Sequence, residues 1–221
     1  MSHHMKIDFV SDISCPWCVI GLQSLEQALN SVGDAVAADI HFQPFELNPE
    51  MTAPGQDVAE HIAQKYGATL DQLAANQENI RTRGAALGFT FNMDKRSRIY
   101  NTFDAHRLLH WAGLEGRQRE LKKALFCAYF TDGRNPSDHD VLVDVATRVG
   151  LDPVHARQVL DSGRYAEDVR EREQFYRQHD IQAVPSIIIN ERYLIQGGQP
   201  PEVFVQALNR IAGETVEGEV P

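Results

Sequence analysis

The chain has 221 residues, 43% of them hydrophobic, and its 21 basic and 31 acidic residues give a formal net charge of −10. This length and apolar content suffice to bury a core without disulfides or a structural metal, in one large domain or in one domain that carries an insertion. An acidic chain without a cluster of Lys or Arg argues against binding to nucleic acid or to an anionic membrane, since both require a basic face.

The first residues carry no recognisable targeting signal. No stretch reaches the roughly 18 consecutive apolar residues of a membrane span, and the N-terminus lacks the apolar core and cleavage site of a secretory signal. We therefore expect a cytoplasmic protein that has neither a membrane nor a nucleic acid as its partner. His3 and His4 could be native or added, so residues 1–4 are left out of the fold prediction.

The chain then begins with the pattern strand, helix, strand. Residues 6–12 alternate as a strand does, and apolar residues recur at helical spacing from Ile20 to Leu29. After Gly33, residues 38–45 alternate again, which predicts a second strand. This order opens a βαβ unit, and it places Cys15 at the transition from the first strand to the helix.

Helical periodicity dominates from about residue 56 to about residue 178. Asp152 before Pro153 predicts the start of one helix, and Ser137 or Asp138 is expected to cap another. Breaks between helices are predicted at residues 67–69, 84–92, 113–116, 132–138 and 150–153.

Strand patterns return only near the C-terminus. Residues 186–190 and 193–195 form a predicted hairpin, followed by a last helix at about 201–212. Chains with strands at both ends often close one sheet from both termini, with the middle inserted as a cap. The predicted organisation is a domain built from residues 5–55 and 179–213, a helical insertion at 56–178, and an acidic tail at 214–221.

Two of the three cysteines form the motif Cys15-Pro16-Trp17-Cys18, and Cys127 stands apart. Three cysteines do not make a disulfide framework, and a zinc site would need a second paired motif that the sequence lacks. No metal is therefore expected, and in a reducing compartment the pair is predicted to be catalytic. Cys127 lies in an apolar helical run and is predicted to pack in the core.

The start of a helix suits a reactive cysteine. Cys15 would face unpaired backbone N–H groups and the positive end of the helix dipole, which favour its thiolate. Because the dipole contributes only about 0.3–1 kcal/mol, we expect further stabilisation from hydrogen bonds that the Cys18 N–H or thiol donates to the Cys15 sulfur. Cys15 would attack a substrate disulfide, and Cys18, one turn deeper and more buried, would resolve the mixed disulfide.

Other polar residues are candidates for supporting roles. Asp8 or Asp12 could accept the Cys18 proton, because burial near a dithiol raises the pKa of a carboxylic acid, although Asp12 could also be a solvated turn residue. His106, in a helical segment of the insertion, either is satisfied by packing or faces the motif across a cleft that Asn48 helps to line. Pro16 fits the first helical position, and Trp17 either packs or contacts substrate.

Four motifs are spread over the chain: Asp12-x-x-Cys15-Pro16-Trp17-Cys18, Pro44-Phe45-Glu46-Leu47-Asn48-Pro49, Asn101-Thr102 with Ala105-His106-Arg107, and Ala183-Val184-Pro185-Ser186. Together they resemble the DsbA-like thioredoxin family, and specifically its FrnE-like branch. The resemblance covers nearly the whole chain. One departure is Ala183, where the family commonly has glycine, so the local backbone would be less permissive here.

The resemblance implies an α/β thioredoxin fold of the DsbA type with a large all-helical insertion. It also implies a cis peptide bond at Val184–Pro185 beside the active-site disulfide, where the Val184 backbone would pair with an extended substrate. Together with the candidates taken from the motif and the predicted elements, the predicted substrate-binding residues are Pro16, Trp17, Asn48, His106, Val184 and Pro185, of which Val184 and Pro185 rest on the resemblance.

The implied activity is that of a protein disulfide oxidoreductase or isomerase acting on protein or small thiol and disulfide substrates. The resemblance favours an oxidase or an isomerase, whereas a reducing cytoplasm would keep the dithiol reduced and favour a reductase or isomerase. No cofactor is required, although glutathione is a candidate redox partner.

Two alternatives stay open. Glutathione-dependent hydroxychromene-carboxylate isomerases and kappa-class transferases resemble this branch, but they carry serine at the position of Cys15. The helical insertion could instead bind client proteins, with redox activity secondary.

Overall fold

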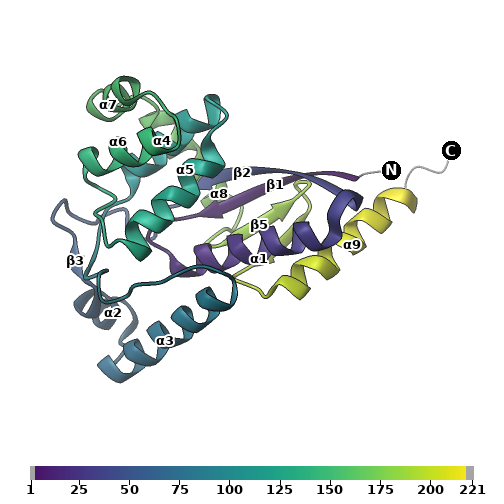
Figure 1. Ribbon diagram of the computed structural model, residues 1–221, viewed down its shortest axis with the longest axis horizontal. Coiled ribbons are helices and arrows are strands. Elements are labelled where there is room, and N and C mark those ends of the chain that lie inside the picture. The colour runs from purple at the N-terminus through teal and green to yellow at the C-terminus, as the bar shows by residue number, and fades with distance from the viewer. Residues whose placement is uncertain (1–2, 218–221) are drawn as a thin grey trace.

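The computed structural model describes the backbone of residues 3–217 and the side chains of residues 3–214. Its main sheet has the strand order β2-β1-β5-β6, with β2 parallel to β1 and with β5 and β6 antiparallel to their neighbours (Figure 1). The strands are β1 (His3–Ser11), β2 (Val36–Pro44), β5 (Ser186–Ile189) and β6 (Tyr193–Gln196). The first two and the last two strands thus come from opposite ends of the chain.

Strand β1 is central, and both of its faces are buried. Met5, Ile7 and Phe9 point to one face, which α1 (Pro16–Val32) and α9 (Pro201–Glu217) cover. Val10 points to the other face, where it packs with Tyr176 of α8 (Ala166–Gln178). Because alternate residues of a strand face opposite sides, one apolar strand can hold a helical layer on each side of the sheet.

The chain between β2 and β5 is mainly helical, and the helices before β4 and after it lie at different ends of the region in Figure 1. Helices α2 and α3 lie on one side of the first turn of α1, and α4 to α7 lie on the other. The elements not yet given are η1 (Gly33–Ala35), β3 (Gln56–Asp57), α2 (Val58–Tyr66), α3 (Leu70–Ala86), β4 (Arg98–Ile99), α4 (Phe103–Leu114), α5 (Gln118–Phe126), the π-helical η2 (Cys127–Thr131), α6 (His139–Arg148) and α7 (Pro153–Asp161).

The predicted fold class, an α/β sheet closed from both ends around a helical insertion, is confirmed. The predicted caps are also found, since Asp152 accepts from the His155 N–H at 2.6 Å and Asp138, rather than Ser137, caps α6. The paired strands β3 and β4 were not predicted, because two residues each are too short to show alternation. Among residues 3–217, no helix is both long and apolar enough to cross a membrane.

Both predicted ends of the fold need correction. Strand β1 begins at His3, so residues 3 and 4, left out of the prediction, pair with β2. The last helix was expected to stop at residue 212, but α9 continues through Gly213 to Glu217, because a glycine inside a helix costs only about 1 kcal/mol. The predicted tail therefore starts as helix, and its residues 218–221 lie outside the described residues.

The prediction that Cys127 packs in the core is wrong. Helix α5 ends at Phe126, and the wider π-helical turn that follows changes which residues face inward. Ala128, Tyr129 and Phe130 are buried there, whereas Cys127 is turned to the surface. A regular helical periodicity could not show this change of face.

A glycine lets α1 approach the segment before β5. A Cβ atom at Gly21 would lie 2.9 Å from Cγ of Pro185, whereas one at Gly213 in α9 would meet nothing within 4 Å. We therefore predict that Gly21→Ala lowers the free energy of unfolding by about 1–3 kcal/mol through overpacking. Gly213→Ala, the matched control, should raise it by about 0.5–1 kcal/mol through helix propensity. Denaturant titration measures both, and equal stability of the two variants would contradict the close approach.

Candidate active site

The Cys-x-x-Cys motif forms the first turn of α1, as predicted. Cys15 is the N-cap residue and Pro16 occupies the start of the helix, where a missing N–H costs nothing. The Cys15 N–H donates to the Asp12 carbonyl at 3.3 Å, and the Cys18 N–H donates to the Cys15 carbonyl at 3.1 Å. The Cys18 N–H is therefore engaged with a carbonyl, and of the two expected partners of the Cys15 sulfur it is the Cys18 thiol that forms the hydrogen bond.

Both thiols are free and lie close to the segment before β5. The Cys15 Sγ is 3.6 Å from the Val184 carbonyl oxygen, and the Val184–Pro185 peptide bond is cis. Cys18 is 0% exposed and Cys15 only 4% exposed, so the expected order of burial holds but the leading thiol is also nearly covered. A substrate must therefore reach Cys15 through a confined approach.

That approach is a groove of about 730 Å³ between the first turn of α1, helices α2 and α3, and the segment before β5. Of the predicted substrate-binding residues, Pro16, Trp17, Asn48 and Val184 line it together with Cys15. Pro185 lies behind Val184 against Gly21 and does not line the groove. The volume of the groove is typical of a site for a small molecule or a peptide.

Cationic side chains line the same groove without a carboxylate partner. Among the described residues, Lys65, Arg96 and Arg177 form no ion pair; each donates instead to a backbone carbonyl. Lys65 Nζ donates to Leu47 at 2.8 Å, Arg96 to Ser14 at 3.4 Å and Arg177 to Glu46 at 2.9 Å. This concentration of unpaired positive charge stands out in a chain whose net charge is −10.

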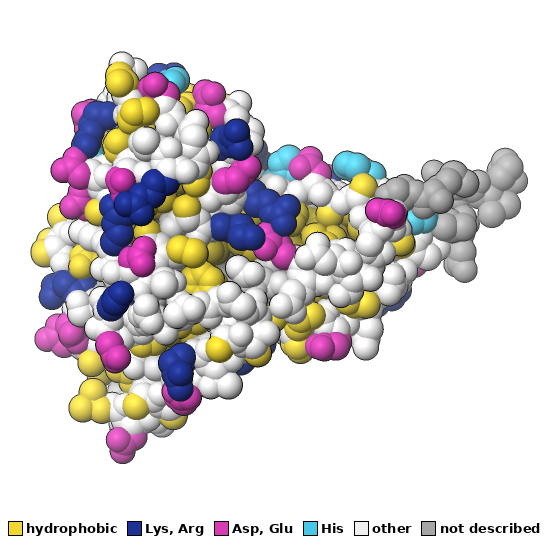
Figure 2. Space-filling view, in the orientation of Figure 1, with side chains coloured by type: hydrophobic (Ala, Val, Ile, Leu, Met, Phe, Trp, Pro, Cys, Tyr) yellow, Lys and Arg dark blue, Asp and Glu magenta, His cyan; other side chains and the backbone are white. Residues whose placement is uncertain are grey.

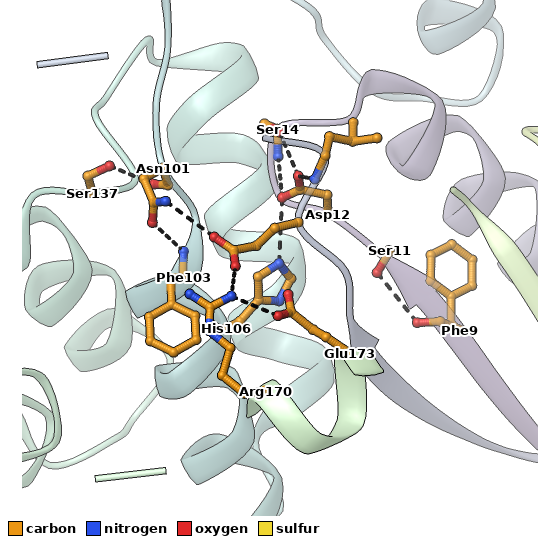
Figure 3. Close-up of polar contacts among 12 residues, drawn as sticks. Phe9, Ser11, Asp12, Ser14, Asn101, Phe103, His106, Ser137, Arg170 and Glu173 are labelled. Atoms are coloured by element: carbon orange, nitrogen blue, oxygen red, sulfur yellow. Dashed lines mark hydrogen bonds and ion pairs between the residues drawn. The ribbon is translucent and has the colours of Figure 1, made fainter. Parts of the chain in front are cut away.

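Asp12 lies directly beneath the motif and is 1% exposed. Its carboxylate accepts from the Ser14 hydroxyl at 2.9 Å and from the Leu47 N–H at 2.7 Å, and its Oδ1 is 3.5 Å from Nε2 of His106 (Figure 3). Burial opposes ionisation, but the hydrogen bond and charge of His106, with the Leu47 N–H and the Thr102 side chain, lower the pKa of Asp12 to about 2. The carboxylate therefore stays ionised at neutral pH.

A second buried carboxylate joins the groove to α8. Glu46 contacts Arg170 and accepts from Asn101 at 3.3 Å, and Arg170 also binds Glu173 at 2.9 Å (Figure 3). Burial, together with the neighbouring charge of Glu173, raises the pKa of Glu46. The motif residues Glu46 and Asn101 thus connect elements of the sheet and of the insertion.

His106 lies on α4 on the far side of Asp12, and the structure does not bring it to the groove. It is buried, and it lines a different cavity, which lies between β2, α4 and α5. The sequence left open whether His106 is a packed helix residue or faces the motif across a cleft. Its buried position fits the first interpretation, and its link to the motif runs through its contact with Asp12.

Sequence reasoning missed Lys122, which is 1% exposed on α5 and is electrostatically coupled to the dithiol. Burial, a hydrogen bond with Cys15 and the charge of Cys15 raise the pKa of the Cys18 thiol well above its usual value, and the charge of Lys122 opposes this shift. The signal was present in the sequence, because Lys122 precedes Leu125 and Phe126 by three and four residues and so falls on the apolar face. Among the side chains of residues 3–214, no group of three or more His, Cys, Asp or Glu residues could hold a metal ion.

Residues 6–209 match the model of the DSBA-like thioredoxin domain. The chain belongs to the DSBA-like thioredoxin domain family. The thioredoxin fold with a helical insertion, and the general class of thiol–disulfide oxidoreductases, follow from this membership.

Known proteins resemble this DSBA-like chain over nearly their full length. A probable DsbA oxidoreductase from Streptomyces coelicolor superposes with a TM-score of 0.90 and is 35% identical, covering 99% of this chain and 92% of its own. The uncharacterized protein YwbO of Bacillus subtilis (strain 168) is 28% identical over 210 residues, which are 95% of this chain and 97% of YwbO. The cytosolic disulfide reductase DsbM from Pseudomonas aeruginosa, solved with GSH, shares the fold at a TM-score of 0.64 and 17% identity, with 93% and 98% of the two chains covered.

The expectation that Asp12 accepts the Cys18 proton is wrong for this DSBA-like site. A general base needs a pKa near the operating pH, and that of Asp12 is about 2. Asp12 is not a solvated turn residue either, because it is buried and hydrogen-bonded on several sides. Asp8 is bound by Gln43 of β2 at 2.6 Å and by Lys6 of β1 at 3.4 Å, and among residues 3–214 no hydrogen bond or ion pair connects it to the thiols.

The low pKa of Asp12 predicts a loss of stability in acid. Because the folded-state pKa is about 2 against an ordinary value of 3.8, its stabilisation is present above pH 4 and is lost as the pH falls toward 2. Asp12→Asn should lower the free energy of unfolding by about 2 kcal/mol at pH 7 and should flatten its decline between pH 4 and 2.

Asp138→Asn is the matched control, because this carboxylate is an exposed N-cap and asparagine caps helices equally well. Urea titrations at several pH values measure both variants. An Asp12→Asn protein with the native stability and the native acid profile would show that the carboxylate network does not stabilise the fold.

Proposed function

We propose that the protein catalyses thiol–disulfide exchange on protein or small-thiol substrates, as an oxidase or isomerase of the FrnE-like branch in the cytoplasm. Cys15 is the nucleophile and Cys18 the resolving thiol. The observation that carries the proposal is the asymmetry of the pair: the Cys15 sulfur adjoins the Val184 carbonyl in the groove, whereas Cys18 is fully buried behind it. Only Cys15 can meet a substrate from the groove.

The reaction follows from that arrangement. The Cys15 thiolate attacks one sulfur of a substrate disulfide, and the other substrate sulfur leaves as a thiolate and takes a proton. Cys18 then loses its proton and attacks the Cys15 sulfur, so the Cys15–Cys18 bond forms and the second substrate thiol is released. The reverse sequence oxidises a substrate dithiol.

The two cysteines should differ in what their removal does. Cys15→Ser should abolish exchange with a fluorescent peptide disulfide, whereas Cys18→Ser should trap the substrate as a stable mixed disulfide on Cys15, visible by mass spectrometry. Cys127→Ser is the matched control, because this exposed thiol lies outside the groove, and its activity should equal the native activity.

Trapping on Cys127, or native activity in Cys15→Ser, would contradict the assignment. The reduction potential of the pair tests the direction: a value above the glutathione poise of roughly −220 to −260 mV agrees with an oxidase or isomerase, and a value well below it makes the protein a reductase. Client protection that persists in the Cys15→Ser, Cys18→Ser double variant would favour the client-binding alternative.

A specific observation also favours a small anionic thiol such as glutathione as substrate or redox partner. The groove is lined by three cations that have no carboxylate partner among the described residues: Lys65, Arg96 and Arg177. A thiol that carries carboxylate groups would provide these partners. The confined approach to Cys15 suits a slim substrate, and the DsbM reductase with the same fold was solved with GSH. With both cysteines present, the chemistry proposed is exchange rather than isomerisation of a carbon skeleton.

Removing one of these positive charges should weaken the binding of an anionic substrate and leave the binding of a neutral one nearly unchanged. We predict that Lys65→Met or Arg177→Met raises KM for glutathione disulfide about tenfold, the loss expected for one charge-assisted hydrogen bond, with little change for the neutral 2-hydroxyethyl disulfide. Arg81→Met is the matched control, since this exposed arginine on α3 pairs with Glu78. An equal effect on both disulfides would mean that the cations do not select for charge.

A further inference from the structure

The faces of α1 and α5 that carry Cys18 and Lys122 are joined by ion pairs. Glu26 of α1 binds Arg119 and Lys123 of α5, each at 2.7 Å. Glu26 lies eight residues after Cys18, so the two share one face of α1, and Lys122 lies three residues after Arg119 on the same side of α5. The ion pairs therefore turn the Lys122 side of α5 toward the Cys18 side of α1.

Lys122 also borders a cavity that is separate from the substrate groove. This cavity has a volume of about 460 Å³ and lies between β2, α4 and α5, and Lys122 and His106 are its buried polar lining. Its rim includes Leu114, Arg119 and Glu120, which are exposed, so it opens to solvent. Neither cysteine lines it.

Among the side chains of residues 3–214, Lys122 Nζ has no ion-pair or hydrogen-bond partner that would hold its charge, and it lies 4.9 Å from the ring centroid of Phe126. A buried lysine without a carboxylate partner changes its protonation state more readily than a paired one. Lys122 thus lies within electrostatic range of the fully buried Cys18 and also lines a cavity that opens to solvent.

We propose that Lys122 takes the proton of the Cys18 thiol during resolution and passes it to solvent through this rear cavity, away from the bound substrate. The inference rests on the proposed exchange chemistry and names the route of its proton. It is needed because Cys18 is 0% exposed and has no solvent contact of its own through which to lose a proton.

The step balances in both directions. In the mixed disulfide, the neutral Lys122 amine accepts the Cys18 proton, the Cys18 thiolate attacks the Cys15 sulfur, and the substrate thiolate leaves with the electron pair and is protonated in the groove. The Lys122 ammonium then releases its proton into the cavity. In the reverse direction the ammonium protonates Cys18 as it leaves, when a substrate thiolate opens the disulfide.

The protonation equilibria support this role. Burial lowers the pKa of the Lys122 ammonium to about 8, although the negative charges of Cys18, Asp12 and Cys15 act in the opposite direction. A lysine with this pKa is neutral in a useful fraction of molecules near neutral pH, whereas one with an ordinary pKa is not. Asp12 remains ionised throughout, so its charge does not change along the reaction.

Several other charged groups around Lys122 and the cavity are held by their own partners. Glu26 is bound by its two α5 cations, His106 faces Asp12, and His41 of β2 binds Asp39 at 2.9 Å. His110 of α4 and Arg172 of α8 line the cavity as well. Burial lowers the pKa of His110, which makes this imidazole a weaker base than the Lys122 amine.

The rate of resolution measures the proposal. Glutathionylated Cys15 is prepared on the full-length protein, and release of glutathione is followed by stopped flow from pH 6 to pH 10. The native rate should rise with pH and level off near pH 8, whereas Lys122→Met should be about 100-fold slower at pH 7 and should keep rising above pH 8. Lys122→Arg should also be slow, because a guanidinium does not release a proton.

Lys95→Met is the matched control, since it removes a lysine that lines neither the groove nor the rear cavity. It should keep the native rate and pH profile. Variants of Lys122 that keep the native profile, or that slow the reaction by the same factor at every pH, would overturn the proposal. Failure of the native protein to release glutathione at any pH would instead refute the exchange chemistry itself.

Two measurements address the route and the risk of misfolding. In Lys122→Ala, added methylamine should accelerate resolution in proportion to its unprotonated fraction, and the absence of acceleration would overturn the route through the cavity. In the native protein, NMR titration of the Lys122 side-chain nitrogen should show a transition between pH 7 and 9. A lysine that stays protonated above pH 10 would overturn the proposal without any substitution.

Discussion

The arrangement of the site depends on one buried carboxylate. Asp12 is placed at the end of β1, and it binds the loop that leads into the motif through Ser14, the segment after β2 through Leu47, and α4 of the insertion through His106. A buried charge is costly unless several partners satisfy it, so these elements must all be in place together. The carboxylate thereby couples the position of the helical insertion to the first turn of α1, where the thiols lie.

The helical insertion surrounds the dithiol from two sides. Helices α2 and α3 and the segment that carries Arg96 wall the groove in front of Cys15. Helices α4 and α5 close the rear of the motif with His106 and the buried Lys122. Substrate and proton therefore have separate approaches to the same pair of sulfur atoms. The ion pairs of Glu26 with α5 fix the rear approach without exposing Cys18.

The charged side chains are arranged differently in the groove and on the rest of the surface. Acidic and basic side chains are interspersed over the face shown in Figure 2, as expected for a chain that is acidic overall. The groove departs from this average, because its cations bind carbonyls rather than carboxylates. A local excess of positive charge beside a nearly covered thiol favours substrates that are both slim and anionic.

The sequence by itself determined the motif, its place at the start of a helix, the sheet closed from both ends, and two of the helix caps, because these depend on local spacing and on the nearest few residues. It also placed Asn48 near Cys15 from its position after the second strand, and Val184 through a resemblance. It could not decide the exposure of Cys127, which a π-helical turn reverses, or the state of Asp12, which depends on His106 nearly a hundred residues away. Lys122 shows the same limit: its place on the apolar face of α5 can be read from the sequence, but its desolvation near the dithiol depends on how α5 packs against α4 and β2, which only the tertiary structure decides.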